Sequence, residues 1–152
     1  MGLVITQTAR NRISAPEAAG LAGITYRQLD YWARRGWLVP SIEAGTGRPG
    51  RRLYSPVDVL RLAALGHLGR SGADVGQLGP QVADLELPAG DVDYLVLLGP
   101  EPSLEVVAAE ELRSRLGSPG TFVVFDPAPL RRQLGLAPAV PTPTHLREAR
   151  TA

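Results

Sequence analysis

Ser14-Ala-Pro-Glu17 and Thr25-Tyr-Arg-Gln28 are the two motifs that decide the fold of the first half of the chain. In each, a Ser or Thr is followed three residues later by Glu or Gln, and the two side chains can then cap the first turn of a helix. Ala22-Gly23 lies between the motifs, so one helix must end and the next begin within a few residues. A turn that is so short and contains glycine makes the helices cross steeply. The sequence therefore predicts a helix-turn-helix whose helices begin at about residues 15 and 26.

A third capping motif, Ser55-Pro-Val-Asp58, predicts another helix from about residue 56. Between the second and third helices, two short extended segments flank the Gly- and Pro-rich stretch 44–50, which is typical of a β-hairpin. Arginines lie along this hairpin, and we interpret it as the wing of a winged helix-turn-helix. A weaker helix is expected over 74–85.

The charge is distributed unevenly along the chain. Residues 1–72 contain ten arginines and four acids, a formal charge of +6, whereas residues 73–152 contain six arginines and eleven acids, a formal charge of −5. The net charge of +1 therefore conceals a basic half and an acidic half. Lysine is absent, so every one of these cations is a guanidinium, which suits bidentate contacts with phosphate or guanine. The basic half is the candidate for nucleic-acid binding.

The second helix and the wing supply the candidate DNA contacts. Leu29 and Trp32 are expected to face the core, which leaves a polar, arginine-rich face directed outward. In helix-turn-helix proteins such a face enters the major groove, while a wing contacts the backbone. The predicted DNA-binding residues are Thr25, Tyr26, Arg27, Gln28, Tyr31, Arg34, Arg35, Arg48, Arg51, Arg52 and Tyr54.

Three parts of the chain resemble the DNA-binding domain of the MerR family: Ile24-Thr-Tyr-Arg-Gln-Leu-Asp-Tyr-Trp-Ala-Arg-Arg-Gly-Trp-Leu-Val-Pro40, the wing, and Arg52-Leu-Tyr-Ser-Pro-Val-Asp-Val-Leu-Arg-Leu62. The phrase from Thr25 to Arg34 looks particularly like the actinobacterial FtsR-type branch, whose members are linked to cell-division genes. The resemblance covers roughly residues 13–85. It implies a dimeric transcription factor whose second helix enters the major groove.

Asp30 departs from the pattern of many MerR-type recognition helices, in which an arginine stands near this position. An acid that faces DNA would repel phosphate, although it could accept a hydrogen bond from cytosine. It could instead be turned toward the protein to orient Arg27 or Arg34, and we favour this intramolecular role. Operator sequences of the wider family should therefore not be transferred to this chain.

The acidic half has its own pattern. Residues 93–98 and 120–125 form two apolar runs, and apolar residues between 103 and 116 recur at helical spacing, which predicts strand, helix, strand with parallel strands. The fold class is then α+β. The expected organisation is an N-terminal arm at 1–12, a winged helix-turn-helix at 13–85, a linker at 86–90, a small α/β unit at 91–135 and a flexible tail at 136–152.

The α/β unit is the candidate dimerisation surface, with an effector site as the alternative use. The long coiled-coil helix that joins many MerR-type dimers has no counterpart in this sequence. A unit of about 45 residues can hardly bury a two-stranded sheet alone, so we expect it to pack against a second copy. Truncation after Leu85 should then leave a folded but monomeric DNA-binding domain. The predicted dimer residues are Tyr94, Val96, Leu98, Leu104, Val107, Leu112, Phe122 and Val124.

Several function classes find little support. The chain contains no cysteine, and its two histidines, His67 and His145, lie far apart, which argues against a metal site and against a catalytic triad. A unit of about 45 residues seldom encloses the roughly 300 Å³ that a drug-like ligand needs. We expect no enzyme activity, no cofactor and no metal. A signal peptide and an apolar run of about 18 residues are also missing, which predicts a bacterial cytoplasmic protein associated with the nucleoid, not with a membrane.

The sequence thus predicts a regulator that binds an operator in double-stranded DNA as a homodimer, with RNA polymerase or another regulator as a further partner. One alternative is an excisionase-like architectural protein that bends DNA for recombination. Another is a protein–protein interaction module that acts through the acidic half. Genome-wide mapping of bound sites separates the three, because promoters, attachment sites and no sites are the respective expectations.

Overall fold

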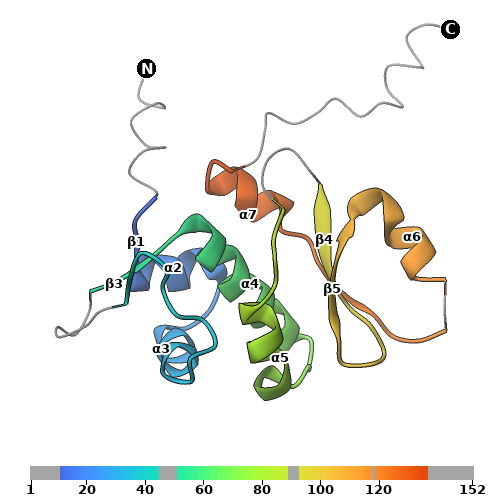
Figure 1. Ribbon diagram of the computed structural model, residues 1–152, viewed down its shortest axis with the longest axis horizontal. Helices are drawn as coiled ribbons and strands as arrows, with labels where there is room; N and C mark the ends of the chain where they lie inside the picture. The colour runs from blue at the N-terminus through green and yellow to red at the C-terminus, as the bar shows by residue number, and fades with distance from the viewer. Residues whose placement is uncertain (1–10, 45–50, 89–92, 118, 137–152) are drawn as a thin grey trace, which may run out of the picture.

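The computed structural model describes residues 11–44, 51–88, 93–117 and 119–136. The first ten residues of the predicted arm, the wing tip with Arg48, the end of the predicted linker and the tail from residue 137 lie outside the described residues. The described chain forms an α+β fold, as the sequence predicts, with a helical half at 13–85 and a small sheet beside it (Figure 1).

The three capped helices begin where the sequence places them: α2 spans Ala15–Ala22, α3 spans Tyr26–Arg34 and α4 spans Pro56–Arg70. Thr25 and Ser55 each form a complete capping box with the third residue of the helix that follows. Gly23 separates α2 from α3 with a φ of 69°, a conformation that glycine adopts without steric cost. The helix-turn-helix is confirmed.

The predicted hairpin is part of a three-stranded antiparallel sheet. Its strands are β2 (Glu43–Ala44) and β3 (Arg52–Tyr54), and a strand that the sequence did not reveal, β1 (Ile13–Ser14), pairs with the other edge of β3. The strand order is β1-β3-β2. The strand β1 therefore fixes the start of α2 against the base of the wing.

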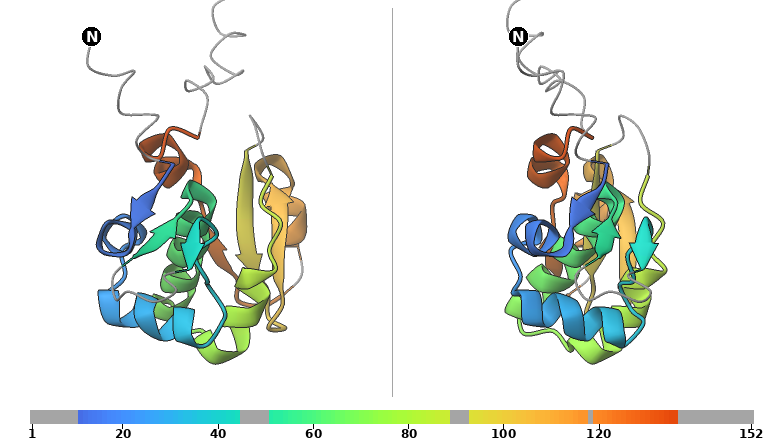
Figure 2. Two further views of the ribbon diagram at one scale, coloured as in Figure 1. Left: turned by 60° about the vertical axis from the view of Figure 1, so that its left-hand side comes forward. Right: turned by 90° about the vertical axis from the view of Figure 1, so that its left-hand side faces the viewer.

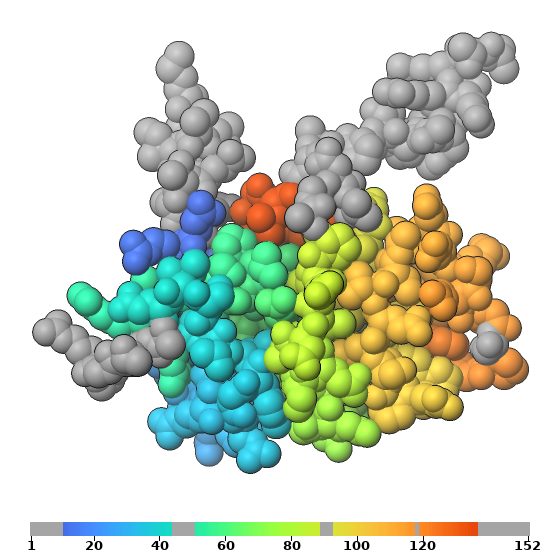
Figure 3. Space-filling view, in the orientation of Figure 1, coloured from blue at the N-terminus to red at the C-terminus, as the bar shows by residue number. Residues whose placement is uncertain are grey.

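The weaker helix is also confirmed, as α5 at Val75–Ala83. Asp74 caps it by accepting hydrogen bonds from the backbone N–H groups of Gly76 and Gln77. This helix packs against α4, and Figure 3 shows it, with the residues that follow, between the helix-turn-helix and the second sheet.

In the acidic half, the prediction of strand, helix, strand is wrong in its middle element. The strands β4 (Tyr94–Leu98) and β6 (Val123–Phe125) lie where expected, but Leu104–Ala108 forms a further strand, β5, and not a helix. Helical structure is limited to a 3₁₀ turn at Ala109–Glu111 and the short α6 at Leu112–Arg115. The sheet order is β5-β4-β6, and both pairings are antiparallel, so the expectation of parallel strands is also wrong.

The second sheet has a different partner on each face (Figure 2). The inner face contributes Leu98, with Val123 and Phe125, to the core of the helical half, which α7 (Ala128–Gln133) and Leu134 complete. The outer face carries Leu95, Leu97 and Val107, which pack with Leu112 beside α6. The sheet thus buries its inner face within its own chain, and self-association is not needed to cover it.

Two side chains of the helical half reach the edges of this sheet. At β5, the side-chain amide of Gln81 accepts a hydrogen bond from the backbone N–H of Leu104 and donates one to the carbonyl of Pro102. At β6, Nε2 of His67 donates to the carbonyl of Val124 over 3.0 Å. These bonds satisfy backbone groups that an edge strand otherwise leaves unpaired. They also tie α5 and α4 to the acidic half.

Candidate nucleic-acid interface

The outward face of α3 is polar and accessible. Leu29 and Trp32 turn inward and are almost completely buried, as their spacing predicts. Tyr26 and Tyr31 remain 49% and 53% exposed, and Arg27 and Arg34 lie on the same side of the helix. The two exposed tyrosines, next to the arginines, provide both hydrogen-bond donors and flat apolar surface. Such a face can contact base edges and phosphates together.

Asp30 connects this face to the wing. Its Oδ2 lies 3.0 Å from Nε of Arg34, one helical turn further along α3, and its Oδ1 lies 2.7 Å from Nη1 of Arg52 on β3. The hydrogen bond from Arg52, with the charge of Arg34, lowers the pKa of the Asp30 carboxyl, and the same bond raises the pKa of the Arg52 guanidinium. The predicted intramolecular role is confirmed for Arg34. Arg27, the other candidate, forms no ion pair with Asp30, and the sequence did not indicate the partner Arg52.

A cluster of aromatic side chains and one arginine lies at the end of α3. The guanidinium of Arg35 lies 5.3 Å from the ring centre of Trp37, and Tyr31 meets the same ring edge-on at 6.0 Å. The Trp37 ring also lies next to Gly79 of α5, so closely that a Cβ atom at position 79 would overlap the ring. Trp37 therefore connects α5 to Tyr31 of α3 and to Arg35 at its end.

Not every predicted DNA contact is available to DNA. Tyr54 is completely buried, and burial raises the pKa of its phenol to about 12, so this residue belongs to the core and its prediction as a DNA contact is wrong. Thr25 and Gln28 are exposed, but their side chains already form the capping box of α3. Arg51 is exposed on the wing. The face that remains consists of Tyr26, Arg27, Tyr31, Arg34, Arg35 and Arg51, with Arg52 held by Asp30.

The predicted dimer residues are divided between the two faces of the second sheet. Leu98 and Leu104 contribute to the core shared with the helical half, and Tyr94 is buried beneath the guanidinium of Arg131. Val96 and Val107 are buried as well. Apart from Leu104, which is only partly buried, these side chains cannot form a surface for a second copy, because their own chain covers them. Leu112, Phe122 and Val124 are also partly exposed.

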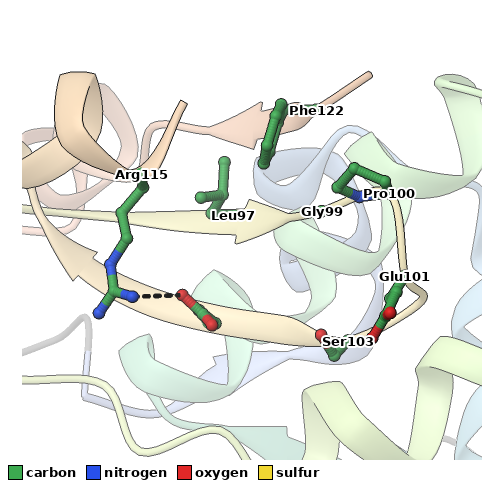
Figure 4. A pocket seen from close by; sticks show the side chains of 8 residues that line it. Leu97, Gly99, Pro100, Glu101, Ser103, Arg115 and Phe122 are labelled. Carbon is green, nitrogen blue, oxygen red and sulfur yellow. Dashed lines mark ion pairs between the residues drawn. The ribbon is translucent and has the colours of Figure 1, made fainter. Parts of the chain in front are cut away.

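A hollow of about 390 Å³ lies at the hairpin end of the outer face (Figure 4). Leu97, Pro100 and Phe122 form its apolar part, and Arg115 and Glu105 face each other across it at 3.8 Å. The hollow is open to solvent rather than enclosed. It therefore does not contradict the sequence argument that the unit is too small to enclose a volume of this order.

Trp37, Gly79 and Gln81 are the residues that sequence reasoning missed. Each acts through a partner that is distant in sequence, so no local motif marks it. Gly79 lies inside α5, where a glycine by itself only weakens a helix. Gly79 is better explained by the close approach of Trp37.

No helix among the described residues is both long enough and apolar enough to cross a bilayer.

Comparison with known proteins agrees with this geometry. Residues 13–77, which include the helix-turn-helix, the wing, α4 and the start of α5, match the model of the MerR HTH family regulatory proteins. Over 124 residues, or 80% of its length, the chain is 35% identical to proteins named as uncharacterised HTH-type transcriptional regulators from two strains of Mycobacterium tuberculosis and from Mycobacterium bovis. The chain spans 55% of the length of these relatives. A place in the FtsR-like branch stays a prediction. At residues 13–77 the chain thus carries a winged helix-turn-helix domain that is similar to those of the MerR family of regulatory proteins.

Proposed function

We propose that this protein is a sequence-specific DNA-binding transcriptional regulator that binds an operator as a homodimer. The observation that carries the proposal is the exposed face of α3. It presents Tyr26, Arg27, Tyr31 and Arg34 next to Arg51 and Arg52 of the wing. A recognition helix next to a basic wing is the arrangement of winged DNA readers. The names of the mycobacterial relatives support the same class of function.

Base recognition is assigned to the first turn of α3, the part of a recognition helix that penetrates a groove most deeply. Arg27 lies in this turn, is exposed and forms no ion pair among the described residues. Its guanidinium can therefore form a bidentate pair with guanine. Arg51 is assigned to a phosphate, because it lies on the wing rather than on the helix. Arg48 receives the same assignment from its place in the sequence.

The substitution Arg27→Ala should weaken binding to a selected operator by about 1–3 kcal/mol and relax the preference at one base pair. Affinity for a mixed-sequence duplex should change much less, because phosphate contacts dominate that binding. Fluorescence anisotropy with both duplexes measures the two effects. Arg132→Ala is the matched control, since it removes the same charge from an exposed position of α7, outside both α3 and the surface around α6. An equal loss of affinity for both duplexes would assign Arg27 to a phosphate.

The homodimer is proposed because one winged module contacts a single half-site, and tight operator binding generally needs two. The outer face of the second sheet is the surface that remains for a second copy. Around α6 it exposes Leu116 by 40%, with the partly exposed Leu112 and Phe122 nearby. This surface replaces the larger one expected from the sequence, much of which is buried within the chain.

Light scattering on the full chain should give the mass of a dimer at micromolar concentration. Leu116→Glu should shift the equilibrium to monomer, because it places a charge in the proposed interface at a position that is already accessible. At a concentration at which both chains are monomeric, the variant should unfold at nearly the same temperature as the unaltered chain. A full chain that is monomeric, or a dimer that Leu116→Glu does not weaken, would contradict the proposed interface.

The proposed location is the bacterial cytoplasm, where the protein would associate with the nucleoid. Mapping of bound sites across a genome tests the regulatory role itself. Clusters at promoters are the expected result. Sites confined to recombination junctions would instead indicate the architectural function.

A further inference from the structure

Asp30 is the one acid in α3, and it lies on the side of the helix that is assigned to DNA. Each of its two oxygens is paired with an arginine from a different element: Oδ2 with Arg34 of α3 at 3.0 Å and Oδ1 with Arg52 of β3 at 2.7 Å. The side chains of Asp30 and Arg52 are only 26% and 23% exposed, whereas Arg34 is 73% exposed. One carboxylate thus holds two guanidinium groups between the recognition helix and the wing.

Neither affinity nor stability accounts for an acid in this place. A negative charge on the DNA-facing side opposes the approach of phosphates, so affinity alone would favour a neutral residue. Solvent-accessible ion pairs stabilise a fold only slightly, which makes the pair with Arg34 a weak source of stability. The contact that distinguishes Asp30 is the one with Arg52, because it joins residues 22 positions apart and ties β3 to α3.

We propose that Asp30 is a positioning residue for sequence discrimination, which orients Arg34 and Arg52 and restrains both from binding the phosphates of arbitrary DNA. The inference rests on the DNA-binding function proposed above and concerns how the same surface discriminates between sequences. Phosphate contacts carry no sequence information by themselves. An arginine must break its ion pair with Asp30 before it can bind a phosphate elsewhere. It therefore adds little to the affinity for a duplex whose sequence does not match. On an operator of matching sequence, α3 is fully inserted in the groove. Arg34 and Arg52 then lie beside the DNA backbone in the orientation that Asp30 gives them.

Asp30→Asn tests this directly, because asparagine keeps the size of the side chain and removes its charge. Two probes are needed: a duplex selected by the unaltered protein from a randomised library, and a mixed-sequence duplex of equal length. For the mixed-sequence duplex, Asp30→Asn should tighten binding about three- to tenfold at low salt and steepen the dependence of log K on log salt by about one. For the selected duplex, affinity should change much less, so the ratio of the two affinities should fall by about three- to tenfold.

A background without both arginines separates positioning from simple repulsion. In the Arg34→Ala/Arg52→Ala variant, Asp30→Asn should leave the salt slope and the affinity ratio unchanged, because Asp30 then has nothing to restrain. Glu17→Gln removes the same charge from an exposed acid of α2 that has no ion pair among the described residues. It should leave the ratio of the affinities for the two duplexes unchanged. Asp30→Glu, which restores the carboxylate, should recover most of the discrimination.

Three results would overturn the inference. The first is an effect of Asp30→Asn that persists in the double-alanine background, which would make Asp30 a source of general repulsion. The second is a loss of preference at a single base pair with an unchanged salt slope, which would make Asp30 a direct reader of cytosine. The third is an unaltered protein that enriches no sequence and binds no duplex, in which case the proposed function fails and the inference fails with it.

Discussion

Leu134→Ala is expected to destabilise the helix-turn-helix as well as the acidic half, by about 2–4 kcal/mol. Leu134 follows α7 and is 4% exposed in the core that contains α2, α3 and α4. Removing its side chain leaves a cavity in the packing of elements from both halves. Both tryptophans of the chain, Trp32 and Trp37, lie in the helical half, so their fluorescence during chemical unfolding reports on that half alone. The tryptophan transition should therefore move to lower denaturant concentration.

Leu116→Ala is the matched control, because the same atoms are removed from a side chain that is 40% exposed. Its effect on the tryptophan transition should be below about 1 kcal/mol. Leu134→Ala could instead leave the denaturant midpoint of the tryptophan transition unchanged and lower only the midpoint of a separate transition. The two halves would then fold independently.

The same packing changes the expected outcome of truncation. From the sequence, a chain that ends after Leu85 should remain folded as a monomeric DNA-binding domain. In the structure, that truncation removes Leu98, Phe125 and Leu134 from the core and exposes the surfaces of α4 and α5 that they cover. We therefore expect the truncated chain to lose much of its cooperative unfolding and its DNA binding.

Gly79→Ala is expected to destabilise the protein by about 1–3 kcal/mol, because the added Cβ would overlap the ring of Trp37 and force the ring or α5 to move. The displaced ring also contacts Tyr31 and Arg35, so the end of α3 should shift with it. Affinity for the selected duplex should therefore fall by more than the loss of folded protein explains. Denaturant unfolding and anisotropy titrations under native conditions measure the two effects separately.

Gly20→Ala is the control for this substitution. Gly20 is an exposed residue within α2, and an added Cβ there would meet no atom within 4 Å. Alanine should stabilise α2 by about 0.5–1 kcal/mol, since glycine is the poorer helix former. Should Gly79→Ala prove equally harmless, Trp37 would not couple α5 to the recognition helix.

The helix-turn-helix could be predicted from sequence because its signals are local. Each capping motif specifies a helix start within four residues, and the structure places α2, α3 and α4 at those starts. Asp30 was recognised as unusual through the resemblance to MerR-type recognition helices, and its pairing with Arg34 could be predicted because Arg34 is one turn away. Arg52, the second arginine paired with Asp30, lies on β3. No motif near Asp30 in the sequence predicts this contact.

Leu104–Ala108 shows where local reasoning fails. Leu104, Val107 and Ala108 recur at helical spacing, but a run this short fits a strand equally well. The adjacent Val106 and Val107 favour a strand, and pairing with all five residues of β4 decides the outcome. Because β5 lies between β4 and β6 in the chain, the simple crossover that would have made β4 and β6 parallel is lost. The burial of the inner face against α4 likewise depends on tertiary contacts that no segment of sequence contains.

The central claim is that the exposed face of α3 reads a DNA sequence. It is tested most directly by selecting duplexes from a randomised library with the full chain and comparing its affinity for the selected duplex with that for a mixed-sequence duplex at one salt concentration. The proposed function predicts enrichment of a defined sequence, bound at least about a thousandfold more tightly than the mixed duplex. Equal affinity for the two duplexes, or enrichment of no sequence, would contradict it.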